Sequence, residues 1–185
     1  MTVEPWKRIE PTEVQKVGWL TIITKNFVLP NGNEHGFQIV NGEDTHNAGV
    51  IGITKDKQVI VAKQFRPGPE KLMHEIAGGG VEKGETDYQT TALRELKEET
   101  GYVPTGAVTH LGDIYKDAYN NSMWHYYLAE DCELHPDGQQ LDEHEFVEPV
   151  LVSIDEFIEF ARTGGMTDVE AVFLAYDKLL ALKNS

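Results

Sequence analysis

Three glutamates near the middle of the chain have the spacing of metal ligands. Glu95, Glu98 and Glu99 stand at i, i+3 and i+4, so a helix brings their carboxylates to one face. Like charges at these spacings repel one another and destabilise a helix by about a few tenths of a kcal/mol per pair. A hard divalent cation such as Mg²⁺ removes that repulsion, because it prefers oxygen ligands. The spacing therefore favours a metal site, while a solvated acidic helix face stays open as the alternative.

The flanking residues predict where such a helix begins and ends. Thr86 and Gln89 have the spacing of a capping box, which starts a helix, and Gly101 suits the position just after the last turn. A helix is therefore expected from about Asp87 to Thr100. The glycines at 78–80 predict a loop in front of this helix that can approach a ligand closely.

Together, the glycine run and the helix resemble the catalytic box of the Nudix hydrolase family, G-x5-E-x7-R-E-U-x-E-E-x-G-U, in which U is an apolar residue. Gly79 and Glu85 supply its first part, and Arg94–Tyr102 supplies the rest. The resemblance implies a set of groups that bind Mg²⁺ or Mn²⁺: the carboxylates of Glu95, Glu98 and Glu99 and the carbonyl of Gly78. It also implies that Arg94 orients the glutamates, so that Arg94 and Glu98 count as catalytic residues.

The sequence departs from the family's box by one residue. Eight residues, Thr86 to Leu93, separate Glu85 from Arg94, where the family has seven. Because the capping box stands where the family's helix begins, the extra residue is expected inside the helix, as a π-bulge between Gln89 and Arg94. The departure leaves Glu85 outside the assigned metal ligands and does not affect the spacing of the three glutamates.

Stretches just before the box extend the resemblance to the ADP-ribose pyrophosphatase branch of the family. Gln64–Pro67 resembles the branch's Q-[YF]-R-P, and Glu75–Gly78 resembles its E-[LF]-P-[AG]. By this likeness Arg66 contacts a substrate phosphate, a role that suits the fork of a guanidinium. An arginine that follows a strand and simply faces solvent is the alternative.

An acidic loop near the end of the chain is a second candidate for catalysis. Asp142–Glu145 falls where the branch has a Glu-x-Glu that supplies a general base. The resemblance implies Glu143 as the base and Glu145 as an assisting carboxylate and metal ligand. A solvated surface loop is the alternative.

Two tryptophans, Trp6 and Trp19, lie in the strand-rich N-terminal segment. The branch exchanges this segment between the subunits of a homodimer and uses aromatic rings in it to stack on the nucleobase. Both residues are therefore candidates for base binding, Trp6 before Trp19, with a core or dimer-interface role as the alternative. The resemblance divides the chain into residues 1–46, for dimerisation and base binding, and a Nudix catalytic domain of residues 47–185.

The hydrophobic pattern predicts strands on both sides of the box and two helices at the end. Strands are expected at Trp19–Thr24, Phe37–Val40, Ala48–Thr54, Gln58–Phe65, Val108–Tyr115, Met123–Ala129 and Val147–Val152. Asn31-Gly32 predicts a hairpin, and capping boxes at Ser153–Glu156 and Thr167–Glu170 predict the two helices. The order predicts an α+β fold, which the resemblance specifies as a mixed-sheet α/β/α sandwich with an N-terminal antiparallel β segment.

The composition bounds the partners and the compartment. The 185 residues carry 16 basic and 31 acidic side chains, and the net charge of −15 repels nucleic acids and anionic lipid. No apolar run has the roughly eighteen residues of a membrane span, and Met1–Glu10 lacks the apolar core of a signal peptide. Cys132, the one cysteine, cannot form an intrachain disulfide. A cytoplasmic protein with neither nucleic-acid nor membrane partners is expected.

These observations predict a metal-dependent enzyme that cleaves a nucleoside diphosphate linked to a sugar. The loop Tyr115–Ser122 lacks the proline that relatives with a preference for ADP-ribose often carry, so other sugars, such as that of GDP-mannose, stay open. One alternative is the same chemistry on a dinucleotide polyphosphate or coenzyme A. The other is a non-catalytic Nudix module that senses a nucleotide. The glutamates at 95, 98 and 99 argue against the sensor, because a protein that only binds does not need them.

Overall fold

The computed structural model describes residues 3–184, which form two compact units. The first unit comprises the described residues up to Thr45 together with Tyr115–Met123, and the second comprises the rest. The segment Tyr115–Met123 groups with the N-terminal strands, because the N–H of Val40 donates to the carbonyl of Tyr119 and the N–H of Asn121 donates to the carbonyl of Val40.

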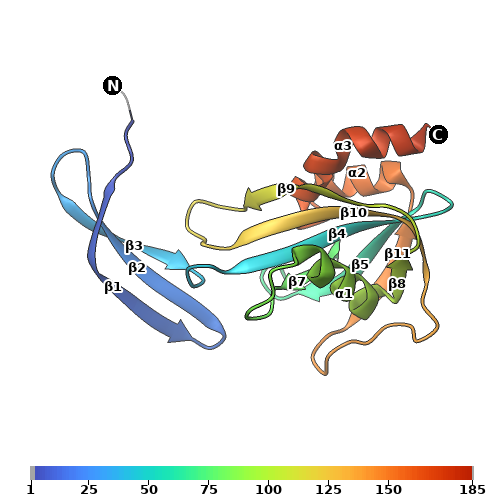
Figure 1. The fold of residues 1–185 in the computed structure, drawn as a ribbon, viewed down its shortest axis with the longest axis horizontal. Coiled ribbons are helices and arrows are strands. Elements are labelled where there is room, and N and C mark those ends of the chain that lie inside the picture. Colours follow the sequence, from blue (N-terminus) through green and yellow to red (C-terminus); the bar gives the residue numbers. More distant parts are fainter. Residues whose placement is uncertain (1–2, 185) are drawn as a thin grey trace. The chain divides into compact units, whose positions relative to one another are not determined.

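The first unit contains an antiparallel sheet of three strands in the order β1 (Lys7–Val17), β2 (Leu20–Val28) and β3 (Glu34–Val40) (Figure 1). The predicted hairpin at Asn31-Gly32 is confirmed, since the N–H of Gly32 donates to the carbonyl of Leu29 across the turn. Strand β1 lies in the segment predicted to be rich in strands, but its bounds were not predicted. Most of its side chains are exposed, so its sequence lacks the alternation of apolar and polar residues that signals a strand.

The second unit is built on an eight-stranded sheet. Its strands are β4 (His46–Thr54), β5 (Val59–Arg66), β6 (Lys71–Glu75), β7 (Ala77–Gly80), β8 (Tyr102–Pro104), β9 (Val108–Tyr115), β10 (Met123–Leu134) and β11 (Val147–Val152). The central path runs β11-β5-β4-β10-β8, with β6 paired to β5, β7 to β4 and β9 to β10. The predicted loop of glycines is therefore wrong, because Gly78 and Gly79 pair with β4 as part of β7.

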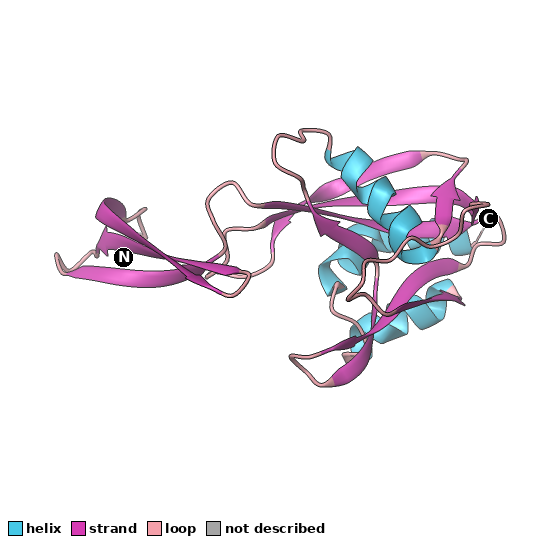
Figure 2. Cartoon of the chain, turned by 90° about the horizontal axis from the view of Figure 1, so that it is seen from below, coloured by secondary structure: helices cyan, strands magenta, loops and turns pink. Residues whose placement is uncertain are grey.

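Helices cover both faces of this sheet. Figures 1 and 2 show α1 (Tyr88–Thr100) on one face and α2 (Ile154–Thr163) with α3 (Val169–Lys183) on the other. Successive side chains of a strand point to opposite faces. In β4, Val50 therefore packs with α1, whereas Ile51 packs with α2 and α3. The predicted α+β sandwich is confirmed. None of the described helices has both the length and the apolar character to cross a membrane.

Helix α1 begins one residue later than the capping box predicted. The carboxylate of Asp87, not the hydroxyl of Thr86, accepts the N–H groups of Gln89 and Thr90, at 3.2 and 3.4 Å. The helix is α-helical from Tyr88 to Thr100, so the predicted π-bulge is also wrong. The extra residue of the box therefore lies in the loop before the helix.

The two C-terminal helices begin differently from each other. At α2 the capping box is confirmed: Ser153 and Glu156 exchange side-chain and backbone hydrogen bonds. At α3 the predicted box at Thr167 does not form. Asp168 occupies the N-cap position without capping the helix. Its carboxylate instead accepts the N–H of Ile76, 3.3 Å away. A tertiary hydrogen bond has thus replaced a local one.

Candidate active site

Helix α1 holds two of the three glutamates, Glu95 and Glu99, against β7. Glu99 is 7% exposed, and its Oε2 accepts the N–H of Gly78 at 3.2 Å. A Cβ added to Gly78 would lie 2.6 Å from the carbonyl oxygen of Ala48, and one added to Gly79 would displace the carboxylate of Glu95, 2.5 Å away. Gly78 therefore permits the close approach of β7 to β4, and its main chain lies directly at the glutamate cluster, defined as Glu95, Glu98 and Glu99.

Arg94 joins two members of the glutamate cluster. Its guanidinium lies 2.8 Å from Oε1 of Glu95 and donates to Oε2 of Glu98 at 2.6 Å. Burial alone would lower the pKa of Arg94, but the charges of the two glutamates and their hydrogen bonds outweigh burial and raise it. One cation therefore fixes two carboxylates, and Glu99 has no such partner among these contacts.

With all its carboxylates ionised, the glutamate cluster would carry more negative charge than Arg94 offsets. Burial raises the pKa of Glu99 to about 8 even though the N–H of Gly78 opposes the shift, and the charges of Glu95, Glu145 and Glu75 add to it. Burial also raises the pKa of Glu95. Burial thus favours the protonated form of both carboxylates, and a bound cation would stabilise them as anions; a hard divalent ion prefers oxygen ligands of this kind. The residues therefore fit a magnesium-type ion.

The acidic loop, Asp142–Glu145, places one carboxylate near the glutamate cluster. Glu145 is close enough for its charge to raise the pKa of both Glu95 and Glu99. Its own carboxylate accepts the N–H of Asp142, which shapes the loop. Glu143 is exposed, and none of the contacts found in the described residues joins it to the glutamate cluster. The structure thus brings Glu145, and not Glu143, to the site.

Arg66 lies at the same edge, bound to a carboxylate that sequence reasoning did not single out. Its guanidinium donates two hydrogen bonds to Glu75, one of them 2.7 Å long, and Gln64 donates a third at 3.0 Å. Glu75 is 4% exposed, so this buried charge depends on Arg66. The hydrogen bond to Glu75, together with the charges of Glu99 and Asp168, raises the pKa of Arg66. Glu75 positions a fork whose remaining N–H donors stay available to a phosphate.

The two tryptophans have different surroundings in the first unit. Trp6 packs against Phe27 and Phe37, with ring centroids 6.3 and 5.6 Å apart, and lines a cavity of about 340 Å³. Tyr119 and Lys25 also line this cavity. Trp19 stands in the turn between β1 and β2 and is 88% exposed. The structure therefore gives Trp6 a pocket and Trp19 none.

Comparison with known proteins decides the family. The NUDIX domain profile matches residues 44–173. The chain belongs to the Nudix family. An ADP-ribose pyrophosphatase of Bacillus subtilis (strain 168) is 29% identical over 154 residues, which cover 83% of this chain and 82% of that protein. A methanol dehydrogenase activator of Bacillus methanolicus is 32% identical over 144 residues, which cover 78% and 76%.

A solved structure gives the fold independently. The "Crystal structure of ADP compounds hydrolase" matches this Nudix protein with a TM-score of 0.79 at 19% identity and covers 100% of both chains. The predicted family, its ADP-ribose pyrophosphatase branch and the sandwich fold are thereby confirmed. Nudix hydrolases generally depend on a divalent metal, which agrees with the buried carboxylates of the glutamate cluster.

The extra residue of this Nudix box leaves the helix undisturbed. Because the insertion lies in the loop before α1, the glutamate cluster keeps its helical spacing. Glu85 is held in that loop, where its carboxylate accepts the N–H of Glu82 at 3.3 Å. The departure from the family pattern therefore concerns how Glu85 is placed and not the three glutamates.

Proposed function

We propose that this Nudix protein hydrolyses the pyrophosphate of a nucleoside diphosphate linked to a sugar, and releases a nucleoside monophosphate and a sugar phosphate. The observation that carries the proposal is the glutamate cluster, in which Glu99 is buried with a pKa of about 8. Such a site is suited to a divalent ion and, through it, to a pyrophosphate. The similarity to an ADP-ribose pyrophosphatase makes ADP-ribose the first substrate to test.

The residues divide the chemistry among them. Glu95, Glu98, Glu99 and the carbonyl of Gly78 are proposed to hold Mg²⁺, or Mn²⁺ in its place. When bound, this ion neutralises the charge of the pyrophosphate and lowers the pKa of the attacking water. Arg94 holds Glu95 and Glu98 in place for the ion. Arg66, fixed by Glu75, is proposed to bind a substrate phosphate through its free donors.

The general base is proposed to come from the acidic loop, and two variants compare its members. If Glu143 is the base, Glu143→Gln lowers kcat about 10²-fold or more and removes the acidic limb of the pH–rate profile. Glu145→Gln then has the smaller effect on kcat and mainly weakens metal binding, since Glu145 is the carboxylate near the glutamate cluster. The opposite ranking of the two variants would transfer the role of base to Glu145.

Trp6 is proposed to stack on the nucleobase in the cavity of the first unit, with Trp19 as the second candidate. Stacking on an aromatic ring contributes about 1–3 kcal/mol per base, so Trp6→Ala is expected to raise KM about tenfold with kcat little changed. Trp19→Ala, at an exposed turn, is the comparison variant: a KM that rises only for Trp6→Ala assigns the base to Trp6, and one that rises only for Trp19→Ala assigns it to Trp19. Steady-state kinetics of both variants measure this, and equal KM values for Trp6→Ala and the parent would limit Trp6 to packing.

A homodimer and a cytoplasmic location are part of the proposal. The three-stranded sheet exposes apolar side chains, among them Val14 and Val17 of β1, at 63% and 49%, which supports a second copy as partner. Cys132 is buried and free, in keeping with a reducing compartment. Sedimentation equilibrium of the purified chain tests the dimer, and a monomer across the micromolar range contradicts it.

Product analysis tests the function directly. The protein is incubated with Mg²⁺ and with ADP-ribose, GDP-mannose, UDP-glucose, a diadenosine polyphosphate or coenzyme A, and the released phosphates are identified. A nucleoside monophosphate from a sugar compound, abolished by a chelator, is the expected result. Turnover of only the diadenosine polyphosphate or coenzyme A would contradict a sugar-linked substrate and would assign the enzyme to that compound instead. Nucleotide binding without any turnover would favour the sensing module.

A further inference from the structure

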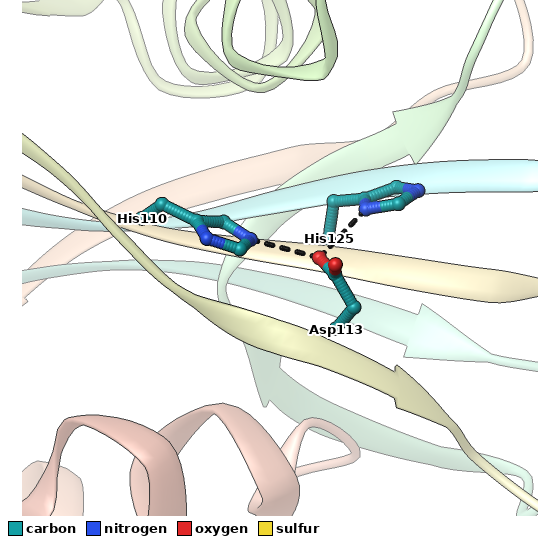
Figure 3. A group of neighbouring side chains, drawn as sticks. All are labelled: His110, Asp113 and His125. Atoms are coloured by element: carbon teal, nitrogen blue, oxygen red, sulfur yellow. Dashed lines mark hydrogen bonds and ion pairs between the residues drawn. The ribbon is translucent and has the colours of Figure 1, made fainter.

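A second group of metal-ligating side chains lies on the sheet, apart from the glutamate cluster. His110 and Asp113 come from β9, and His125 comes from the neighbouring strand β10 (Figure 3). Nε2 of His110 lies 2.8 Å from Oδ1 of Asp113, and Nδ1 of His125 lies 2.7 Å from the same oxygen. The three ligand atoms are all within 4.8 Å of one another. This set of three is called the histidine cluster below.

An irregularity in β9 brings His110 and Asp113 to the same side. In a regular strand, residues three apart point to opposite faces. Here Leu111 and Ile114 both pack on the core, and His110 and Asp113 are both exposed, so the alternation slips by one residue at Gly112. Gly112 has a φ of 153°, a positive value that favours glycine. The backbone of β9 is thus shaped in a way that places both side chains beside His125.

His125 is held rigidly in the orientation that the histidine cluster needs. It is 6% exposed and lies face to face with Tyr88, with ring centroids 3.7 Å apart and an interplanar angle of 11°. Its second nitrogen, Nε2, lies 3.0 Å from Nδ1 of His46. Ligating histidines typically have such a partner on the other ring nitrogen, which fixes the tautomer and the direction of the ligating lone pair.

We propose that the histidine cluster is a second metal site, which binds one divalent transition-metal ion of the zinc type. Two imidazoles and a carboxylate suit Zn²⁺ and its neighbours in the series, whereas Mg²⁺ prefers an all-oxygen set. His110 and Asp113 have side chains 49% and 44% exposed, so water can complete the coordination. The net charge of −15 attracts cations to the surface in general.

The hydrogen bonds around the histidine cluster allow the exchange of protons for a metal ion. Oδ1 of Asp113 is the shared partner of both rings. In the metal-free protein each imidazole donates an N–H to this one oxygen. A metal ion bound to Nε2 of His110 and Nδ1 of His125 would displace these two protons. Each neutral ring then carries its proton on the other nitrogen, which is Nδ1 in His110 and Nε2 in His125. For His125 that proton is then donated to Nδ1 of His46, which lies at hydrogen-bond distance.

The proposed ion would connect β9 to β10 and stabilise the protein without taking part in hydrolysis. It binds the folded chain through residues of two strands, so it shifts unfolding by mass action. This site goes beyond the proposed function, since none of its ligands belongs to the glutamate cluster. The two proposals therefore stand or fall separately.

Calorimetric titration of the full chain with Zn²⁺, in saturating Mg²⁺, tests the site. We expect one Zn²⁺ per chain. His46→Phe keeps a ring beside Tyr88 and should weaken binding about 10- to 100-fold, as expected for a supporting residue. His110→Ala and Asp113→Asn remove ligands and should weaken binding further. Both residues are exposed, so these variants should fold, and their Mg²⁺-dependent hydrolysis should equal that of the parent.

A matched control and a spectroscopic readout complete the experiment. His135 also lies beside an aspartate, 3.4 Å from Asp137, so His135→Ala should leave Zn²⁺ binding unchanged. Nitrogen-15 spectra of the histidine rings should show Zn²⁺ moving the ring proton of His110 to Nδ1 and that of His125 to Nε2. Zn²⁺ binding that survives His110→Ala and Asp113→Asn, or that disappears in Glu98→Gln, would overturn the proposal. Hydrogen bonding alone would then account for the histidine cluster.

Discussion

Glu98→Gln should lower kcat on the best sugar substrate by about three orders of magnitude, roughly 4 kcal/mol in the activation free energy. Glutamine keeps the size of the side chain but removes the charge that the proposed ion requires. Arg94 now donates to Glu98 at 2.6 Å, and it can donate to the amide oxygen instead, so the helix keeps its geometry. The loss should therefore appear in turnover and in metal affinity and not in folding.

Stability measurements separate this prediction from a general loss of structure. The ion pair between Arg94 and Glu98 is one-third exposed on both sides, and such pairs contribute about 0–1 kcal/mol. The melting temperature of the metal-free variant should thus stay within a few degrees of the parent. Glu159→Gln, on the exposed side of α2, is the control and should alter neither rate nor stability. A rate for Glu98→Gln near that of the parent would remove Glu98 from the proposed ligands.

The local sequence was enough to predict the glutamate cluster, because the periodicity of a helix alone places residues three and four apart on one face. Glu95, Glu98 and Glu99 share a face wherever α1 begins, so placing the start at Thr86 instead of Asp87 left the prediction of a shared face intact. The start itself was missed because Thr86 and Asp87 are both good N-cap residues, and the choice depends on the path of the preceding loop. The predicted π-bulge was wrong because a loop accommodates an extra residue at a lower cost in free energy than a helix does.

Contacts between distant segments were beyond the sequence. Glu75 lies opposite Ala62 in the β5–β6 pair, and the side chain of Arg66 reaches it from four residues further along β5, a contact that no periodicity predicts. The histidine cluster depends on the pairing of β9 with β10 and on the slip at Gly112. In a regular strand, His110 and Asp113, three residues apart, would point to opposite faces, so the sequence offered no reason to group them. The packing of Tyr115–Met123 with the N-terminal strands is likewise a tertiary choice.

The burial of Glu99 gives the second prediction with a large effect, which concerns the metal-free protein. The folded-state pKa of Glu99, about 8, lies above its ordinary value of 4.5, so the native fold favours the protonated form. Its contribution to stability is full below pH 4.5 and is lost as the pH rises through 8. In a chelator, the free energy of unfolding should therefore fall between these values. Each unit of pKa corresponds to about 1.4 kcal/mol, so the loss is on the order of a few kcal/mol.

Urea unfolding of the parent and of Glu99→Gln at pH 5.5 and pH 8 isolates this contribution. Glutamine has no charge to bury, so the variant should lose less stability than the parent over that interval, while Glu159→Gln should follow the parent. At pH 8, Mg²⁺ should raise the free energy of unfolding of the parent more than that of Glu99→Gln. A bound cation favours the ionised carboxylate, which only the parent has at position 99. Equal pH dependence in the parent and Glu99→Gln would mean that the carboxylate is solvated, and the glutamate cluster would then lack the buried carboxylate from which its metal site is inferred.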